Sequence, residues 1–293
     1  MIILKTDRLT VKMLEPGEGT NSLERFDHTC YVDQVTLDGK YDFLTGEPEG
    51  LLSHRLTGGH GLVSELKCDE LGIEAGEGAW FPKFGVGLLY NENGGKFTFR
   101  EPYKMEPFDV TWKATDSEAV FEMAPRECMG YALREKRTVK AEGNTVTFLY
   151  EYENVGEKAL SLGEYVHNFM TIEHKPLSPS YHLEAAVKNL DGRGPERDAG
   201  TVYGKGSGLG WTGYYGASSM FFLTAEDFDE SRPFFWKLTN DESSAWVMEE
   251  VSFKPAKAPV WSIDHIVSCE CYNNFTIAPG ETVKYWRKWT FGD

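Results

Sequence analysis

Two side chains, an imidazole and a carboxylate, are the strongest candidates for chemistry in this sequence. His167 lies in the segment Tyr165-Val166-His167-Asn168-Phe169, at the end of a run that predicts a buried β-strand. Glu270 lies in a second apolar run, from Ile266 to Tyr272. An imidazole and a carboxylate on rigid strands can act as a paired acid and base, and each role contributes on the order of 10²–10⁴ in rate. Their distance in the chain suits groups that approach one substrate from different sides.

Strand alternation indicates which neighbouring side chains lie on the same face of the strand as each of these two. A period of two places His167 on one face with Tyr165 and Phe169, and Glu270 on one face with Ser268 and Tyr272. A simpler interpretation is open for each. His167 would then be a core histidine held by one hydrogen bond, and Glu270 a solvated strand residue.

Composition narrows the classes of partner. The chain has 293 residues, of which 41% are hydrophobic and 14% aromatic, so it can bury a large core and still line a cleft with rings on which sugars stack. The formal net charge of −16 repels phosphate backbones and anionic lipids. We therefore expect a small-molecule carbohydrate as partner, with no nucleic acid and no membrane. A neutral sugar is indifferent to this charge, whereas an anionic one needs a locally basic pocket.

Targeting, disulfide and cofactor signals are weak. The apolar run at the N-terminus is too short for a secretory signal, and no stretch approaches the ~18 apolar residues of a membrane span. The cysteines are odd in number and scattered, which predicts no disulfide framework. Cys269 and Cys271 flank Glu270 without a second pair at zinc spacing. We expect a cytoplasmic protein with no metal and no cofactor, and the sequence leaves the oligomeric state open.

Strand and turn signals recur along the whole chain. Apolar residues alternate with polar ones over residues 145–152, and Asp38-Gly39 between two apolar runs favours a two-residue hairpin turn. Pro279-Gly280 suits a type II turn between strands at residues 275–277 and 283–286, which we expect to form a hairpin.

Sustained helical periodicity, linkers and repeats are not recognisable. The sequence therefore predicts one all-β domain over residues 1–293, a large antiparallel sandwich. The glycine-rich stretch 189–210 is the best candidate for long loops.

Several segments of the sequence, taken in their order and spacing, resemble those of a known protein family. The segments are Arg25-Phe26-Asp27, Asp38-Gly39-Lys40, 61–66, 76–87, 150–158, 164–169 and 277–281, the last followed by Trp286 and Trp289. Together they resemble the galactose mutarotase-like superfamily, which includes the aldose 1-epimerases, and the chain looks most like an uncharacterised microbial branch. The resemblance covers most of the chain. It implies a large antiparallel β-supersandwich with a sugar-binding cleft on a concave face.

The resemblance also implies roles for particular residues. His167 aligns with the acid that protonates the ring oxygen of the sugar, and Glu270 with the base that accepts the anomeric proton. Further residues could hold sugar hydroxyls or stack on a pyranose face, namely Arg25, Arg55, His60, Glu65, Lys83 and Trp286. The paired-histidine motif of galactose enzymes is matched only in part, by the segment 58–61, so the sugar is not specified.

The expected function is interconversion of the anomers of a free sugar by acid-base ring opening. Two alternatives stay open on the same scaffold, because fold alone does not fix function. One is a non-catalytic carbohydrate-binding protein. The other is a sugar-phosphate epimerase or a lyase, and a phosphorylated substrate would need a cluster of basic residues at the cleft.

Overall fold

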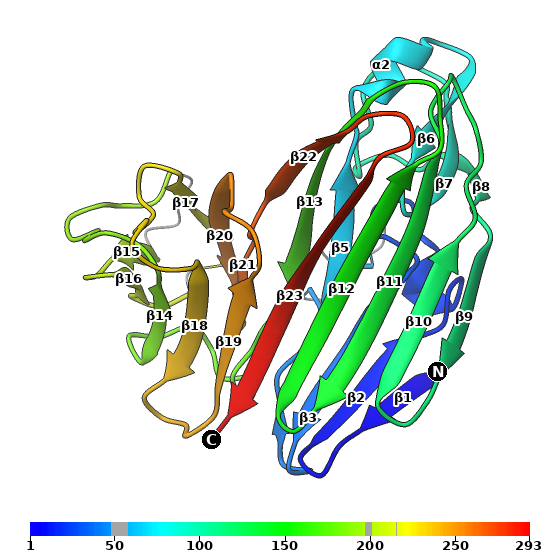
Figure 1. Ribbon diagram of the computed structural model, residues 1–293. Helices are drawn as coiled ribbons and strands as arrows, with labels where there is room; N and C mark the ends of the chain where they lie inside the picture. The colour runs from blue at the N-terminus through cyan, green and yellow to red at the C-terminus, as the bar shows by residue number, and fades with distance from the viewer. Residues whose placement is uncertain (48–57, 197–200, 215) are drawn as a thin grey trace.

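The computed structural model describes residues 1–47, 58–196, 201–214 and 216–293, and strands dominate it (Figure 1). Helical structure in these ranges is limited to the 3-10 turn η1 (Gly19–Ser22) and the helix α2 (Leu71–Ala75). No helix among the described residues has the length and apolar character that a membrane crossing requires. The prediction of an all-β, antiparallel fold is confirmed.

Ten antiparallel strands of the described chain form the larger sheet. Their bounds are β9 (Val110–Ala114), β10 (Glu118–Met123), β11 (Leu133–Glu142), β12 (Thr145–Asn154), β14 (Tyr181–Ala185), β15 (Val202–Gly204), β16 (Gly208–Trp211), β18 (Phe235–Asn240), β19 (Trp246–Val251) and β23 (Thr282–Gly292). Their order in the sheet is β15-β16-β14-β18-β19-β23-β12-β11-β10-β9.

A second sheet has seven strands, and two small sheets have three each. The seven are β1 (Ile2–Lys5), β2 (Leu9–Leu14), β3 (Tyr31–Leu37), β4 (Tyr41–Asp42), β5 (Leu62–Lys67), β13 (Leu160–Asn168) and β22 (Asn273–Ile277). Their order is β1-β2-β3-β5-β13-β22, with β4 paired to β3. The small sheets are β6 (Ala79–Lys83), β7 (Gly87–Asn91) and β8 (Lys104–Pro107), and β17 (Ser219–Thr224), β20 (Lys257–Ile263) and β21 (Ile266–Cys269).

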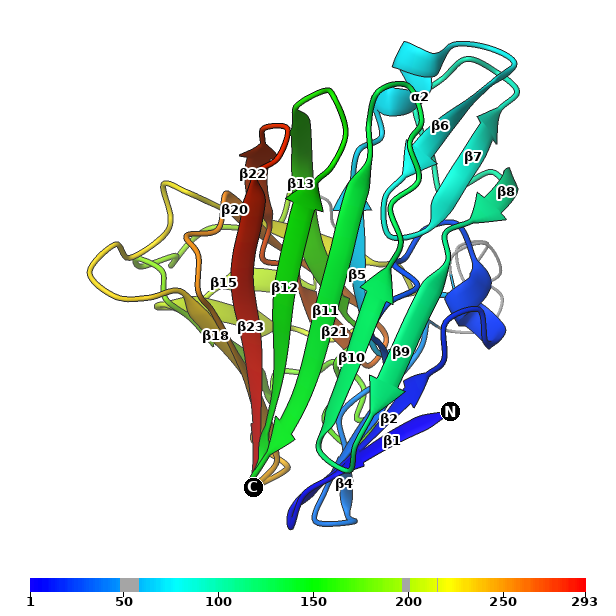
Figure 2. The ribbon, with the colours of Figure 1, turned by 45° about the vertical axis from the view of Figure 1, so that its right-hand side comes forward.

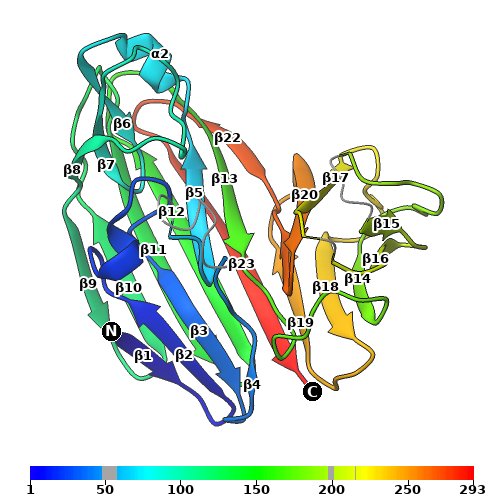
Figure 3. The same ribbon diagram turned by 180° about the vertical axis from the view of Figure 1, so that it is seen from behind.

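The two large sheets pack face to face. Figure 2 shows β23, β12, β11 and β10 in front of the layer that contains β5 and β13, and Figure 3 shows that layer from the other side. Alternation builds the core between them: Val146, Phe148, Tyr150 and Tyr152 of β12 are buried, as the sequence predicts, and pack in one cluster with Val166 of β13. Because β13 contributes one face to this core, its other face is available for a site.

Both predicted turns form, but one connects different partners from those expected. Asp38 and Gly39 have φ of 52° and 65°, and the Lys40 N–H donates to the Leu37 carbonyl at 2.9 Å. Gly280 has φ of 80°, which suits a type II turn. The hairpin expected around it is wrong, because β22 pairs with β13 whereas β23 pairs with β12 and β19. The turn instead carries the chain from one sheet to the other.

The sequence predicts long loops over the glycine-rich stretch 189–210. In the structure this stretch contains the paired strands β15 and β16. A Cβ at Gly204 would lie 2.0 Å from the Leu190 carbonyl oxygen, and a Cβ at Gly208 would lie 2.0 Å from that of Leu183. Gly204 and Gly208 therefore allow close approach of neighbouring backbones.

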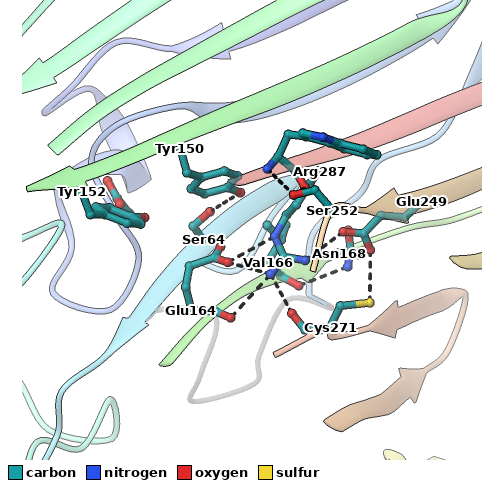
Figure 4. Close-up of polar contacts among 12 residues, drawn as sticks. Ser64, Tyr150, Tyr152, Glu164, Val166, Asn168, Glu249, Ser252, Cys271 and Arg287 are labelled. Atoms are coloured by element: carbon teal, nitrogen blue, oxygen red, sulfur yellow. Dashed lines mark hydrogen bonds and ion pairs between the residues drawn. The ribbon is translucent and has the colours of Figure 1, made fainter. Parts of the chain in front are cut away.

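A buried arginine ties β13 to the segment that carries Glu270. The Arg287 guanidinium, on β23, donates to Glu164 Oε2 at 2.6 Å and to Glu249 Oε1 at 3.0 Å (Figure 4). It also donates to the Cys271 carbonyl oxygen at 2.6 Å, directly after Glu270. All three side chains are fully buried. The guanidinium therefore bonds to two carboxyl groups that water does not reach, and burial raises the pKa of Glu249.

Candidate active site

His167 and Glu270 are brought together by neighbouring backbones. His167 lies near the end of β13, and Glu270 follows the last residue of β21. The Asn168 side-chain amide donates to the Cys269 carbonyl at 2.7 Å, and the Glu270 N–H donates to the Pro259 carbonyl at 2.8 Å. These bonds fix both segments, and His167 Nε2 lies 3.3 Å from Glu270 Oε1.

The pair borders a cavity of about 600 Å³. Aromatic side chains form part of its wall, namely Phe99, Tyr165, Trp261 and Tyr272. Charged groups also line it, including Arg25, Glu65, Lys67 and Arg100. Apolar walls with a few convergent polar groups are typical of small-molecule sites, and aromatic faces with hydrogen-bonding groups suit a sugar.

The surroundings of the imidazole disfavour its charged form. The ring of His167 stacks on Phe169 with centroids 4.0 Å apart and meets Phe26 and Trp261 edge-on. Burial lowers the pKa of His167 well below its usual value, and the nearby Arg25 guanidinium lowers it further. The imidazole is therefore neutral at neutral pH.

Glu270 has the opposite tendency. It is 6% exposed, and burial raises its pKa to about 8, although the positive charge of Arg25 favours the carboxylate. At neutral pH, Glu270 therefore retains its proton, whereas the imidazole 3.3 Å away carries no charge. The pair thus combines a proton donor and a proton acceptor before any ligand binds.

Ser268 supports the other side of the imidazole. Its hydroxyl oxygen accepts the Asn168 N–H at 3.0 Å and lies 3.1 Å from His167 Nδ1. A hydroxyl can accept a hydrogen bond from Nδ1–H or donate one to unprotonated Nδ1, so this contact orients the ring in either tautomer.

A second group of charges surrounds Glu65. Arg25 Nε donates to Glu65 Oε2 at 3.0 Å, and Lys83 Nζ lies 3.2 Å from Glu65 Oε1. The Tyr165 hydroxyl donates to Glu65 and accepts from Arg25 Nη2 at 3.1 Å. Although burial opposes ionisation, the charges of Lys83, Lys67 and Arg25 hold the pKa of Glu65 well below its usual range. Glu65 is therefore an anion that fixes Arg25 at the cavity wall.

Of the other candidate sugar-binding residues predicted from the sequence, some line the cavity and others do not. Arg25 and Glu65 line the cavity with the pair. Lys83 is fully buried behind Glu65 and does not line it. His60 lies outside the lining, with Nδ1 3.5 Å from Asp33 Oδ1. Trp286 is 36% exposed on β23, in the opposite sheet, and lies away from the cavity. Arg55 falls outside the described residues.

The sequence assigned no role to three residues that contribute to the site, Ser268, Tyr272 and Lys67. Alternation offered a signal for the first two, because they lie two positions on either side of Glu270 on the same face. Lys67 lies two positions after Glu65 and contacts its Oε1 at 3.2 Å. Among the described residues, no group of three or more His, Cys, Asp or Glu side chains is arranged to hold a metal ion.

Solved structures with the same fold are similar to this chain over nearly its whole length. A galactose mutarotase related enzyme from Lactobacillus acidophilus aligns with 100% of this chain and 97% of its own, with a TM-score of 0.59 and 10% identity. A galactose mutarotase-like protein from Lactobacillus casei aligns with 99% of each chain, with a TM-score of 0.60 and 14% identity.

An aldose epimerase homologue from C. elegans aligns with 99% of this chain and 98% of its own, with a TM-score of 0.54 and 10% identity. No family model matches the sequence, and no curated protein matches it. At these identities the likeness concerns the fold: the chain has the galactose mutarotase-like fold, as the resemblance implied.

Proposed function

We propose that this protein is an aldose 1-epimerase-like isomerase that interconverts the anomers of a free sugar. The observation that carries the proposal is the 3.3 Å contact between His167 Nε2 and Glu270 Oε1 at the wall of a cavity with aromatic and polar sides. The ring oxygen and the anomeric hydroxyl are bonded to the same carbon. Two groups one hydrogen-bond length apart can therefore address both oxygens.

The proposed reaction needs one proton donor and one acceptor. The acceptor takes the proton of the anomeric hydroxyl while the donor protonates the ring oxygen, so that the C1–O5 bond breaks and a carbonyl forms. Rotation about C1–C2 presents the other face of the carbonyl. As the ring closes, the donor takes back the proton of the C5 hydroxyl and the acceptor returns its proton to the carbonyl oxygen.

We assign the donor role to Glu270 and the acceptor role to His167, which reverses the roles that the resemblance implies. Burial supports this order, because it raises the pKa of Glu270 to about 8 and keeps the imidazole neutral. With the carboxyl proton directed at Nε2, the ring proton lies on Nδ1 and is donated to Ser268 Oγ. Ser268 then orients the acceptor.

The same proposal treats residues 1–293 as one domain. One cluster of buried apolar side chains includes Ile2 near the N-terminus and Phe291 near the C-terminus. The groups around the cavity also come from distant parts of the chain, from Arg25 to Tyr272.

The test is α/β anomer exchange by NMR with a panel of monosaccharides. We expect His167→Ala and Glu270→Gln each to lower the catalysed rate by on the order of 10²–10⁴. The matched controls are His182→Ala and Glu250→Gln, whose side chains pair with Asp241 and Lys288 away from the cavity. Wild-type rates in both active-site variants would refute the proposal. Saturable sugar binding without catalysed exchange would instead favour a non-catalytic binding protein.

A further inference from the structure

A guanidinium at the cavity wall lies over two aromatic rings. The Arg25 Cζ atom is 4.6 Å from the ring centroid of Phe26 and 4.2 Å from that of Phe99. Phe26 is the next residue in the chain, whereas Phe99 belongs to the loop 92–103 between β7 and β8. Nothing in the proposed reaction uses this loop, although Phe99 lines the cavity.

The hydrogen bonds of Arg25 leave one of its nitrogens for a ligand. Nε donates to Glu65 Oε2 at 3.0 Å, and Nη2 donates to the Tyr165 hydroxyl at 3.1 Å. Within the part of the chain that the structure describes, no acceptor bonds to Nη1. A planar guanidinium with two nitrogens tied and its face against a ring can present the third nitrogen in only one place. That nitrogen therefore meets whatever occupies the cavity that Arg25 lines.

The loop that carries Phe99 has a fixed base. The Phe97 N–H donates to the Asp69 carbonyl at 3.0 Å, and the Thr98 N–H donates to the Tyr103 hydroxyl at 3.0 Å. The rings of Phe97 and Tyr103 lie 5.4 Å apart, and Phe97 is buried. Because packing and hydrogen bonds hold both of its sides, the loop fixes Phe99 before any ligand binds.

Glu65 joins this base to Arg25. Lys83 Nζ lies 4.5 Å from the ring centroid of Phe97 and 3.2 Å from Glu65 Oε1. The other oxygen of the same carboxylate accepts the Arg25 Nε–H. One carboxylate thus connects the cation at Phe97 with the cation at Phe99. This arrangement gives the buried Lys83 a place in the support of the loop.

We propose that Phe99 is a positioning residue, which holds the Arg25 guanidinium at the cavity wall so that Nη1 meets the substrate at a fixed place. The inference rests on the proposed function and adds a residue to the machinery of the same site. An aromatic ring stabilises a cation over its face, and more strongly where water is excluded. The ring face that meets the guanidinium cannot also stack on a pyranose, so Phe99 acts through Arg25 and not as a surface for the sugar.

The direct test observes Arg25 in the ligand-free protein. Protons over an aromatic ring resonate upfield, so the nitrogen–proton NMR signal of Arg25 Nε should move downfield in Phe99→Leu and stay near its wild-type position in Phe99→Tyr. Its loss in Arg25→Gln assigns the signal. The matched control is Phe235→Leu, because Arg232 lies 5.1 Å from the Phe235 ring centroid, away from the cavity. An Arg25 signal that Phe99→Leu leaves unchanged would overturn the inference.

A double-substitution cycle measures the consequence for anomer exchange. We expect Phe99→Leu to lower kcat/KM by about tenfold, the order of a cation–π contact shielded from water, and Phe99→Tyr to restore most of it. In Arg25→Gln, which is itself slower, adding Phe99→Leu should change kcat/KM by less than about twofold, because the contact is already lost. An equal loss in both backgrounds would show that Phe99 acts on the cavity directly and would also overturn the inference.

The two measurements separate this inference from the proposed function. If wild type catalyses no exchange, the proposed function fails, and the Arg25 signal still decides whether Phe99 holds the guanidinium. If wild type catalyses exchange and Phe99→Leu keeps its full kcat/KM, the proposed function stands and the positioning role of Phe99 is refuted.

Discussion

Glu270→Gln tests the burial of the carboxyl through the stability of the protein. The side chain is 6% exposed, and its pKa is about 8 in the folded protein against an ordinary value of 4.5. Between these two pH values the folded state binds more protons at this site than the unfolded chain does. The free energy of unfolding therefore falls as pH rises from about 4.5 to about 8. At about 1.36 kcal/mol per pH unit, the loss over the whole window is roughly 5 kcal/mol.

Urea unfolding followed by tryptophan fluorescence measures this contribution. Wild type and Glu270→Gln are compared from about pH 5 to about pH 8, with Glu250→Gln as a control on the surface. His167 is present in both proteins, so the difference between them reports the titration of Glu270 together with its coupling to His167. We expect wild type to lose stability relative to Glu270→Gln as pH rises, by several kcal/mol in total. Parallel curves for the two proteins would refute the burial argument, because the carboxyl would then have an ordinary pKa.

Two further substitutions test the groups that support the pair. Ser268→Ala should lower kcat/KM for anomer exchange by about 10-fold to 100-fold through loss of ring orientation, and Ser268→Thr should restore most of it; equal activity of the alanine and threonine variants would contradict this role. Arg287→Met should lower the free energy of unfolding in urea by about 3–5 kcal/mol, because Glu164 and Glu249 remain buried without a counter-ion. A loss below about 1 kcal/mol would show that those carboxyls are neutral in the folded protein.

The fold class could be predicted because local signals agree along the chain. Alternation in β12 and the turn chemistry at Asp38-Gly39 are properties of a few adjacent residues. The partners of β22 and β23 could not be predicted in this manner. Pro279-Gly280 forms the same turn whether the two strands pair with each other or enter different sheets. The difference depends on which sheet buries each strand, and that is set by distant residues.

The site could be predicted only in part. The positions of His167 and Glu270 were indicated by the resemblance, but their contact depends on hydrogen bonds that join β13 to the end of β21. Lys83 illustrates the opposite difficulty. From its residue type, Lys83 is a candidate to bind a sugar. In the structure its ammonium group is buried beside Glu65. Burial and charge pairing decide such roles, and neither is visible in residue type.

The most direct test of the account is the pH dependence of kcat/KM for anomer exchange, from about pH 5 to about pH 9, after subtraction of the uncatalysed rate. This quantity reports the ionisation of the free enzyme. If protonated Glu270 donates to the ring oxygen and neutral His167 accepts the anomeric proton, kcat/KM is level near neutral pH. It then falls about tenfold per pH unit above about 8. A kcat/KM that rises through pH 8 would contradict this, because the carboxylate of Glu270 would then be the base.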